Sequence, residues 1–188
     1  MIREGLRNIN VWNDEKKALF AEIMRLLTDD RGALERFEAL LKDPDSYYEN
    51  HVNGYEEKFF NPNETEDEIC WQELATELYR AGCLQYLDWD PDFEPWEPEL
   101  RKIPGMEKYL GWLPEKGSGP ERMKVLNGHL REENLVLAAI DIDSESYPLI
   151  LITPALLREV NTLAESAGHR IVPAECLFEG QPIGGSET

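Results

Sequence analysis

Two apolar runs joined by a short polar turn are the clearest pattern in the chain. Residues 135–142 are almost entirely apolar, and after the turn at 143–146 the apolar pattern resumes at 147–152. Two such runs separated by Asp and Ser residues predict an antiparallel β-hairpin. Because neither run alternates strictly between apolar and polar residues, we expect both faces of these strands to be covered.

A capped helix and a third strand follow the hairpin. Thr153 has the side chain of an N-cap, and Pro154 occupies the first helical position, where its missing N–H has no consequence. Apolar residues then recur at helical spacing as far as Ala167, and Gly168 is placed to end the helix. Residues 169–172 are short and β-like. The pattern predicts a unit of strand, strand, helix and strand on which the rest of the chain packs.

The N-terminal part of the chain has a helical period. Asn13 can cap a helix that runs to about Leu27, and Asp29 or Asp30 can cap a second helix that ends before Pro44. The link between them is short. The two segments are therefore expected to form an antiparallel helical hairpin.

A third helix leads into a further strand. Thr65 and Glu68 have the spacing of a capping box, and the apolar period that follows continues to Ala81 and is closed by Gly82. Residues 84–89 then have the composition of a strand. We expect this strand to pair with the hairpin.

Taken in order, these elements predict an α+β fold, with an N-terminal helical hairpin and further helices packed on a small, mainly antiparallel sheet. Pro120 begins one more helix before the hairpin. The chain is expected to be a single domain, 1–188, with a helical part at 10–82, a sheet-containing part at 83–175 and a frayed tail at 176–188.

The composition of the chain is that of a folded globular protein. The chain has 188 residues, is 41% hydrophobic and lacks any run approaching the roughly 18 apolar residues of a membrane span. Its first residues do not form the apolar core of a signal peptide. Cys70, Cys83 and Cys176 are odd in number and unpatterned. We therefore expect reduced thiols and a cytoplasmic protein.

Charge is the main compositional feature. The chain has 38 acidic and 19 basic residues, a formal net charge of -19. From Asp43 to Glu99, 17 acidic residues are accompanied only by Lys58 and Arg80. Such an excess repels nucleic acid and anionic membranes and favours a protein partner with a basic surface. The alternative is an acidic surface that merely keeps the protein in solution.

The best candidate for a partner-binding surface is the end of this acidic region. Its prolines prevent a regular element over 90–99 and reduce the entropy lost on docking. We expect Trp96 to be exposed and Trp89 to be buried, although a structural crossing loop would explain the same residues. The Tyr47–Phe60 loop is the next candidate. The predicted partner-binding residues are Asp88, Asp90, Asp92, Phe93, Glu94, Trp96, Glu97 and Glu99.

Catalytic and cofactor motifs were not found. His51, His129 and His169 lack the spacing of a zinc site, and no glycine-rich phosphate loop or nucleophile elbow occurs. His169 follows a helix-ending glycine and is expected to be structural. We therefore expect no catalytic residue, no metal and no cofactor.

One group of carboxylates offers an alternative to this conclusion. Aspartates spaced two apart project from the same face of a strand, and neighbouring strand ends could then hold a hard cation. Solvated turns are the preferred explanation, because Asp and Ser side chains bond their own backbone in turns. The aspartates concerned are Asp141 and Asp143 at one strand end and Asp88, Asp90 and Asp92 at the other.

The hairpin also carries a resemblance. The run from Ala138 to Leu149 reads Ala-Ala-Ile-Asp-Ile-Asp-Ser-Glu-Ser-Tyr-Pro-Leu, and the helix after it ends Ala-Gly-His-Arg-Ile. Leu87-Asp88-Trp89-Asp90 precedes them. Together they resemble an uncharacterised bacterial domain family with an Asp-x-Asp-Ser-x-Ser-Tyr hairpin. That family implies no catalytic residue, and its wider similarity is to small acidic immunity proteins encoded beside bacterial toxins.

These observations favour an intracellular immunity protein that binds a cognate toxin, plausibly a nuclease, and occludes its basic active-site cleft. An acidic adaptor or regulatory binding domain would present the same surface. A carboxylate- or metal-dependent enzyme is the third alternative. A toxin gene beside the coding sequence would favour the first.

Overall fold

The computed structural model describes residues 12–44, 46–47, 65–88, 96–143 and 146–177. It confirms an α+β fold with N-terminal helices and a four-stranded antiparallel sheet. The chain divides into two compact units. The helical unit comprises Met1–Cys83 and Glu159–Arg170, and the sheet unit comprises Leu84–Arg158 and Ile171–Thr188. The boundary between the units at Cys83 and Leu84 lies close to the boundary predicted between the helical and sheet-containing parts at 82/83. The organisation of 1–188 as a single domain stays a prediction.

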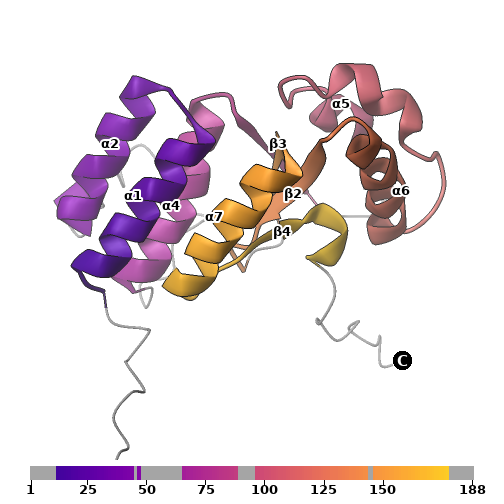
Figure 1. Ribbon diagram of the computed structural model, residues 1–188. Helices are drawn as coiled ribbons and strands as arrows, with labels where there is room; N and C mark the ends of the chain where they lie inside the picture. Colours follow the sequence, from indigo (N-terminus) through magenta and orange to yellow (C-terminus); the bar gives the residue numbers. More distant parts are fainter. Residues whose placement is uncertain (1–11, 45, 48–64, 89–95, 144–145, 178–188) are drawn as a thin grey trace, which may run out of the picture. The chain divides into compact units, whose positions relative to one another are not determined.

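Helices α1 (Asp14–Leu27), α2 (Arg31–Lys42) and α4 (Glu66–Arg80) form the helical unit with the second half of α7 (Pro154–Ala167) (Figure 1). The predicted caps are confirmed. The Asn13 side chain accepts a hydrogen bond from Lys16 N, and that of Asp30 accepts one from Ala33 N. Thr65 and Glu68 form the expected capping box.

The interior of the helical unit consists of one apolar stripe from each helix. Apolar residues three or four apart lie on one face of a helix, so three such faces can enclose a common core. The most deeply buried side chains of α1, α2 and α4 are Phe20, Ile23, Met24, Phe37, Leu40, Trp71, Leu74 and Leu78.

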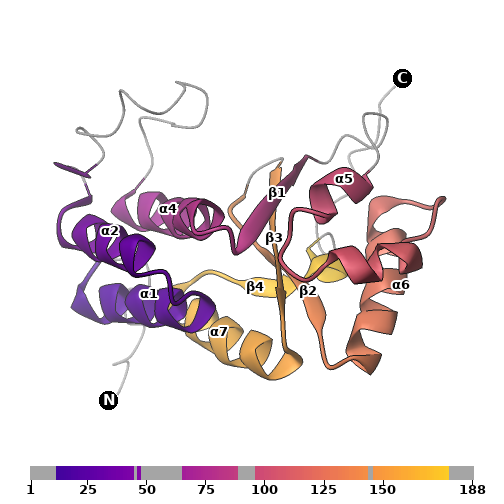
Figure 2. The same cartoon turned by 90° about the horizontal axis from the view of Figure 1, so that it is seen from above.

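The sheet has the strand order β1-β3-β2-β4, and every neighbouring pair is antiparallel (Figure 2). The predicted hairpin and the predicted pairing of β1 with it are both confirmed. Pro148 in β3 lies opposite Tyr86 of β1 but beyond the last β2–β3 pair, Ala139↔Leu149, so its missing N–H is tolerated on the β2 side. The strands are β1 (Leu84–Asp88), β2 (Val136–Ile140), β3 (Ser146–Ile152) and β4 (Ile171–Pro173).

Short helices and α6 pack against one face of this sheet (Figure 2). They are α5 (Trp96–Leu100), η2 (Glu107–Trp112), α6 (Gly119–Glu132) and η3 (Ala174–Cys176). Their apolar side chains, Leu126 among them, form one cluster with Leu137 and Leu149 of the strands. A single turn such as α5 is marginal by itself, so burial in this cluster is what stabilises it.

The helix α5 corrects one expectation. The prolines were expected to prevent any regular element over 90–99, but residues 96–99 belong to α5. Pro98 lies in the first turn, where backbone N–H groups have no partner within the helix and a proline removes nothing.

Candidate partner-binding surface

The structure describes only part of the predicted partner-binding surface. Asp88 is the last residue of β1 and lies opposite Ser146 of β3. Trp96, Glu97 and Glu99 belong to α5. The remaining predicted residues, Asp90, Asp92, Phe93 and Glu94, lie outside the described residues, as do Trp89 and the loop residues 48–60.

Trp96 is buried, so the expectation that it is exposed is wrong. Its exposed fraction is 4%, and its side chain belongs to the core cluster of the sheet unit. The guanidinium carbon of Arg122, on α6, lies 4.7 Å from the centre of its ring. Trp96 is therefore a core residue that fixes the start of α5, and it cannot be the aromatic side chain that a partner buries.

The carboxylates of α5 do reach solvent, and they are paired. The Glu97 and Glu99 side chains have exposed fractions of 53% and 30%. Arg101 bridges Glu97 and Glu107 at 2.7 Å each, and Lys102 lies 2.6 Å from Glu99. Hydrogen bonds to Glu107 and Glu97 raise the pKa of Arg101. Exposed pairs of this kind contribute little stability, so their cations can be exchanged for those of a partner.

Asp88 and the Asp141–Asp143 pair, which are the described members of the alternative cation site, lie at the ends of strands that are not neighbours in the sheet. Because β3 lies between β1 and β2, their strand ends are two strand spacings apart, about 10 Å. Asp143 has a φ of 51°, and its N–H donates to Asp141 Oδ1 at 3.2 Å, which is the geometry of a turn. No group of three or more potential ligands suited to a metal ion occurs in the described part of the chain.

Cys70 lacks the environment of a nucleophile. Cys70, Cys83 and Cys176 are free thiols. Cys70 is fully buried on α4, and this burial raises the pKa of its thiol. A thiol with a raised pKa is protonated at neutral pH and unreactive.

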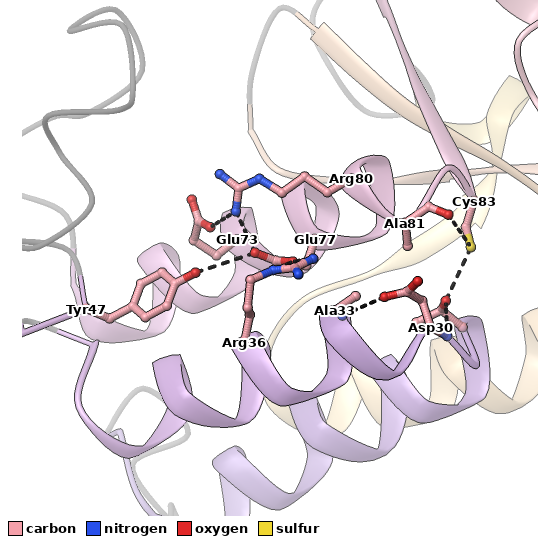
Figure 3. A network of polar contacts seen from close by, with 10 residues as sticks. Asp30, Ala33, Arg36, Tyr47, Glu73, Glu77, Arg80, Ala81 and Cys83 are labelled. Carbon is pink, nitrogen blue, oxygen red and sulfur yellow. Dashed lines mark hydrogen bonds and ion pairs between the residues drawn. The ribbon is translucent and has the colours of Figure 1, made fainter.

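A buried ion-pair network between α2 and α4 was missed by sequence reasoning. Glu77 is 1% exposed. It accepts hydrogen bonds from Arg36 Nε at 2.8 Å and from Arg80 Nη1 at 2.5 Å, and the Tyr47 hydroxyl lies 3.5 Å away. Figure 3 shows these three side chains converging on Glu77. Burial, followed by the negative charge of Glu77, raises the pKa of Tyr47.

This network joins α2 to α4. Glu73, 3.8 Å from Arg80, adds a second buried carboxylate, so two carboxylates balance two guanidinium groups. Glu73 and Glu77 are one helical turn apart beside the apolar stripe of α4, which is the only signal in the sequence. Arg36, the partner of Glu77, is 41 residues away from it, and no local pattern indicates this pairing.

A second polar cluster surrounds His169. Its ring stacks on Trp71, with centroids 4.4 Å apart and planes 12° apart, and its Nε2 lies 3.3 Å from Asp67 Oδ2. The same oxygen accepts a 2.6 Å hydrogen bond from Lys16. Burial opposes the ionisation of Asp67, but the polar contacts with His169 and Lys16 outweigh it and lower the pKa of Asp67. This packing fits the structural role expected for His169.

Comparison with known proteins identifies a family without naming an activity. The sequence profile described as Domain of unknown function (DUF6630) matches residues 19–174, which is most of the chain and includes both units. No curated protein and no solved structure matches the chain significantly.

Proposed function

The chain belongs to the DUF6630 domain family, and we propose that it is an acidic immunity protein that binds and neutralises a cognate bacterial toxin. The toxin is a nuclease whose basic active-site cleft the protein occludes. The observation that carries this proposal is the net charge of -19, most of it between Asp43 and Glu99. A nuclease holds phosphate with cationic side chains, so an acidic protein is steered to that cleft and competes for it.

The described carboxylates support a surface that includes α5. Glu97, Glu99 and Glu107 are solvent-accessible, and two cations accompany these three carboxylates. Charge supplies association rate and specificity more than affinity, so a buried aromatic anchor is also needed. With Trp96 in the core, Phe93 is the remaining aromatic residue of the predicted set.

The proposed partner also determines a compartment. A toxin inhibitor that protects its own cell acts in the cytoplasm, and three free thiols suit a reducing environment. Among the described residues, no helix combines the length and apolarity needed to cross a membrane.

Capture from the native cell, followed by a nuclease inhibition assay on the captured partner, tests the proposal. We expect the wild-type protein to inhibit the partner and the Glu97→Gln/Glu99→Gln variant to associate more slowly, with a weaker dependence on salt. Glu35→Gln/Glu38→Gln is the matched control, because these α2 carboxylates are also exposed and paired with arginines.

Two results would contradict this reading. A captured protein that binds without losing any enzymatic activity would favour the adaptor alternative. If the α5 and α2 variants change the association rate equally, the interface lies elsewhere. Glu→Gln substitutions in the Tyr47–Phe60 loop would then be tested in the same assay.

A further inference from the structure

A contact from α6 adds to the core cluster that holds α5 in place. The helix has five residues, and Trp96 and Leu100 are its buried side chains, 4% and 1% exposed. The Arg122 guanidinium covers the Trp96 ring at 4.7 Å. Arg122 is itself fixed, because its Nε donates to the carbonyl oxygen of Pro114 at 2.8 Å.

Trp96 helps to fix the carboxylates that follow it, beside the Gln85 amide, which donates to Glu99 Oε2 at 3.1 Å. Glu97 is the next residue in the chain, and the Glu97 and Glu99 carbonyls accept the N–H groups of Arg101 and Lys102 at 2.9 and 3.0 Å. Side chains held in place before docking lose less entropy on binding. We infer that Arg122 is a positioning residue for the partner-binding surface: through Trp96 it holds Glu97 and Glu99 where a basic partner meets them. The inference rests on the proposed function of that surface.

Charge and positioning predict opposite effects when Arg122 is removed. Losing a cation makes the protein more acidic and should strengthen the binding of a basic ligand. Losing the contact with Trp96 should loosen α5 and weaken that binding. Lys124 supplies the matched control, because it is an exposed cation on the same helix and its removal changes the net charge equally.

Hydrogen exchange in the full-length protein measures the positioning without a partner. In Arg122→Ala we expect the amides of Arg101, Lys102 and Ile103 to exchange about 2- to 5-fold faster than in Lys124→Ala. This factor is the change in an equilibrium constant that the loss of one cation–π contact of ordinary strength produces. Arg122→Lys keeps the charge but lacks the planar guanidinium and its Nε donor, so its exchange should also be faster than in wild type.

A labelled deca-arginine peptide, titrated by fluorescence anisotropy at low salt, measures the consequence for binding. Arg122→Ala should bind it about 2- to 5-fold more weakly than Lys124→Ala, by the same contact strength. Identical exchange and identical peptide affinity in these two variants would overturn the inference. If Glu97→Gln/Glu99→Gln binds the peptide as tightly as Glu35→Gln/Glu38→Gln, the proposed surface is wrong, whereas the exchange rates still decide whether Arg122 positions α5.

Discussion

Replacing Asn127 by alanine should destabilise the protein by about 3 kcal/mol, because its side chain completes the hydrogen bonding of a strand. Asn127 is fully buried on α6. Its Nδ2 donates to the carbonyl oxygen of Leu137 at 2.9 Å, and the Leu137 N–H donates to its Oδ1 at 2.7 Å. Leu137 directly precedes the three β2 residues that pair with β4, and β4 does not extend far enough to pair with it. The side-chain amide of Asn127 therefore makes the hydrogen bonds that a further β4 residue would make.

The magnitude follows from the groups left without partners. In Asn127→Ala the buried N–H and C=O of Leu137 both lose their hydrogen bonds, and each unsatisfied buried group costs about 1–3 kcal/mol. Glu175 also loses a donor but keeps its ion pair with Arg131. Water that enters the space left by the side chain can satisfy part of the two groups' hydrogen bonding, so the expected loss of unfolding free energy is about 3 kcal/mol.

Urea unfolding followed by circular dichroism measures this loss. Asn161→Ala is the control, because Asn161 donates to Glu165 on the exposed side of α7, and its loss should cost less than about 0.5 kcal/mol. A loss below about 1 kcal/mol for Asn127→Ala would refute the reasoning, since the network predicts at least one unsatisfied backbone group. Equal losses at both positions would refute it as well.

The remaining predictions use the same urea assay. Glu77→Gln should cost about 2 kcal/mol, because the buried carboxylate is lost while both guanidinium groups can still reach water. Gly128→Ala should stabilise α6 by about 1 kcal/mol, since an added Cβ meets nothing within 4 Å. Leu149→Ala should cost about 2–5 kcal/mol, and Leu151→Ala less, because Leu151 is only partly buried. The pKa of Asp67 is lowered in the folded protein, so this carboxylate stabilises the fold at pH 7 and that stabilisation is lost as the pH falls below about 4. The Asp67→Asn variant should therefore be less stable than wild type at pH 7, and its stability should vary less with pH in that acid range. Unchanged stability in any of these variants, or an unaltered acid transition in the last, would contradict the corresponding contact.

The sequence by itself determined the elements whose causes are local. Asn13 and the Thr65–Glu68 pair act within one helical turn, so the patterns that predicted them are also the contacts that the structure contains. The hairpin follows from two apolar runs and a polar turn between them, and strand β1 was recognisable from its composition. These signals lie within a few residues of their consequences.

Only the tertiary structure decided which distant residues meet. Trp96 was expected to be exposed because acidic residues and prolines surround it in sequence, but its burial depends on Arg122 and the cluster beneath the sheet. The order β1-β3-β2-β4 similarly places β3 between the strand that ends at Asp88 and the strand that precedes Asp141, although the spacing alone allowed them to be neighbours.

The buried polar groups show the physical reason most directly. Glu77 needs Arg36, and Asn127 needs Leu137, because a polar group removed from water must find a partner inside the protein. Which partner it finds depends on how helices and strands pack, and packing brings together residues that share no local pattern. Periodicity therefore identifies which face of a helix is buried, whereas only the folded chain determines what that face touches.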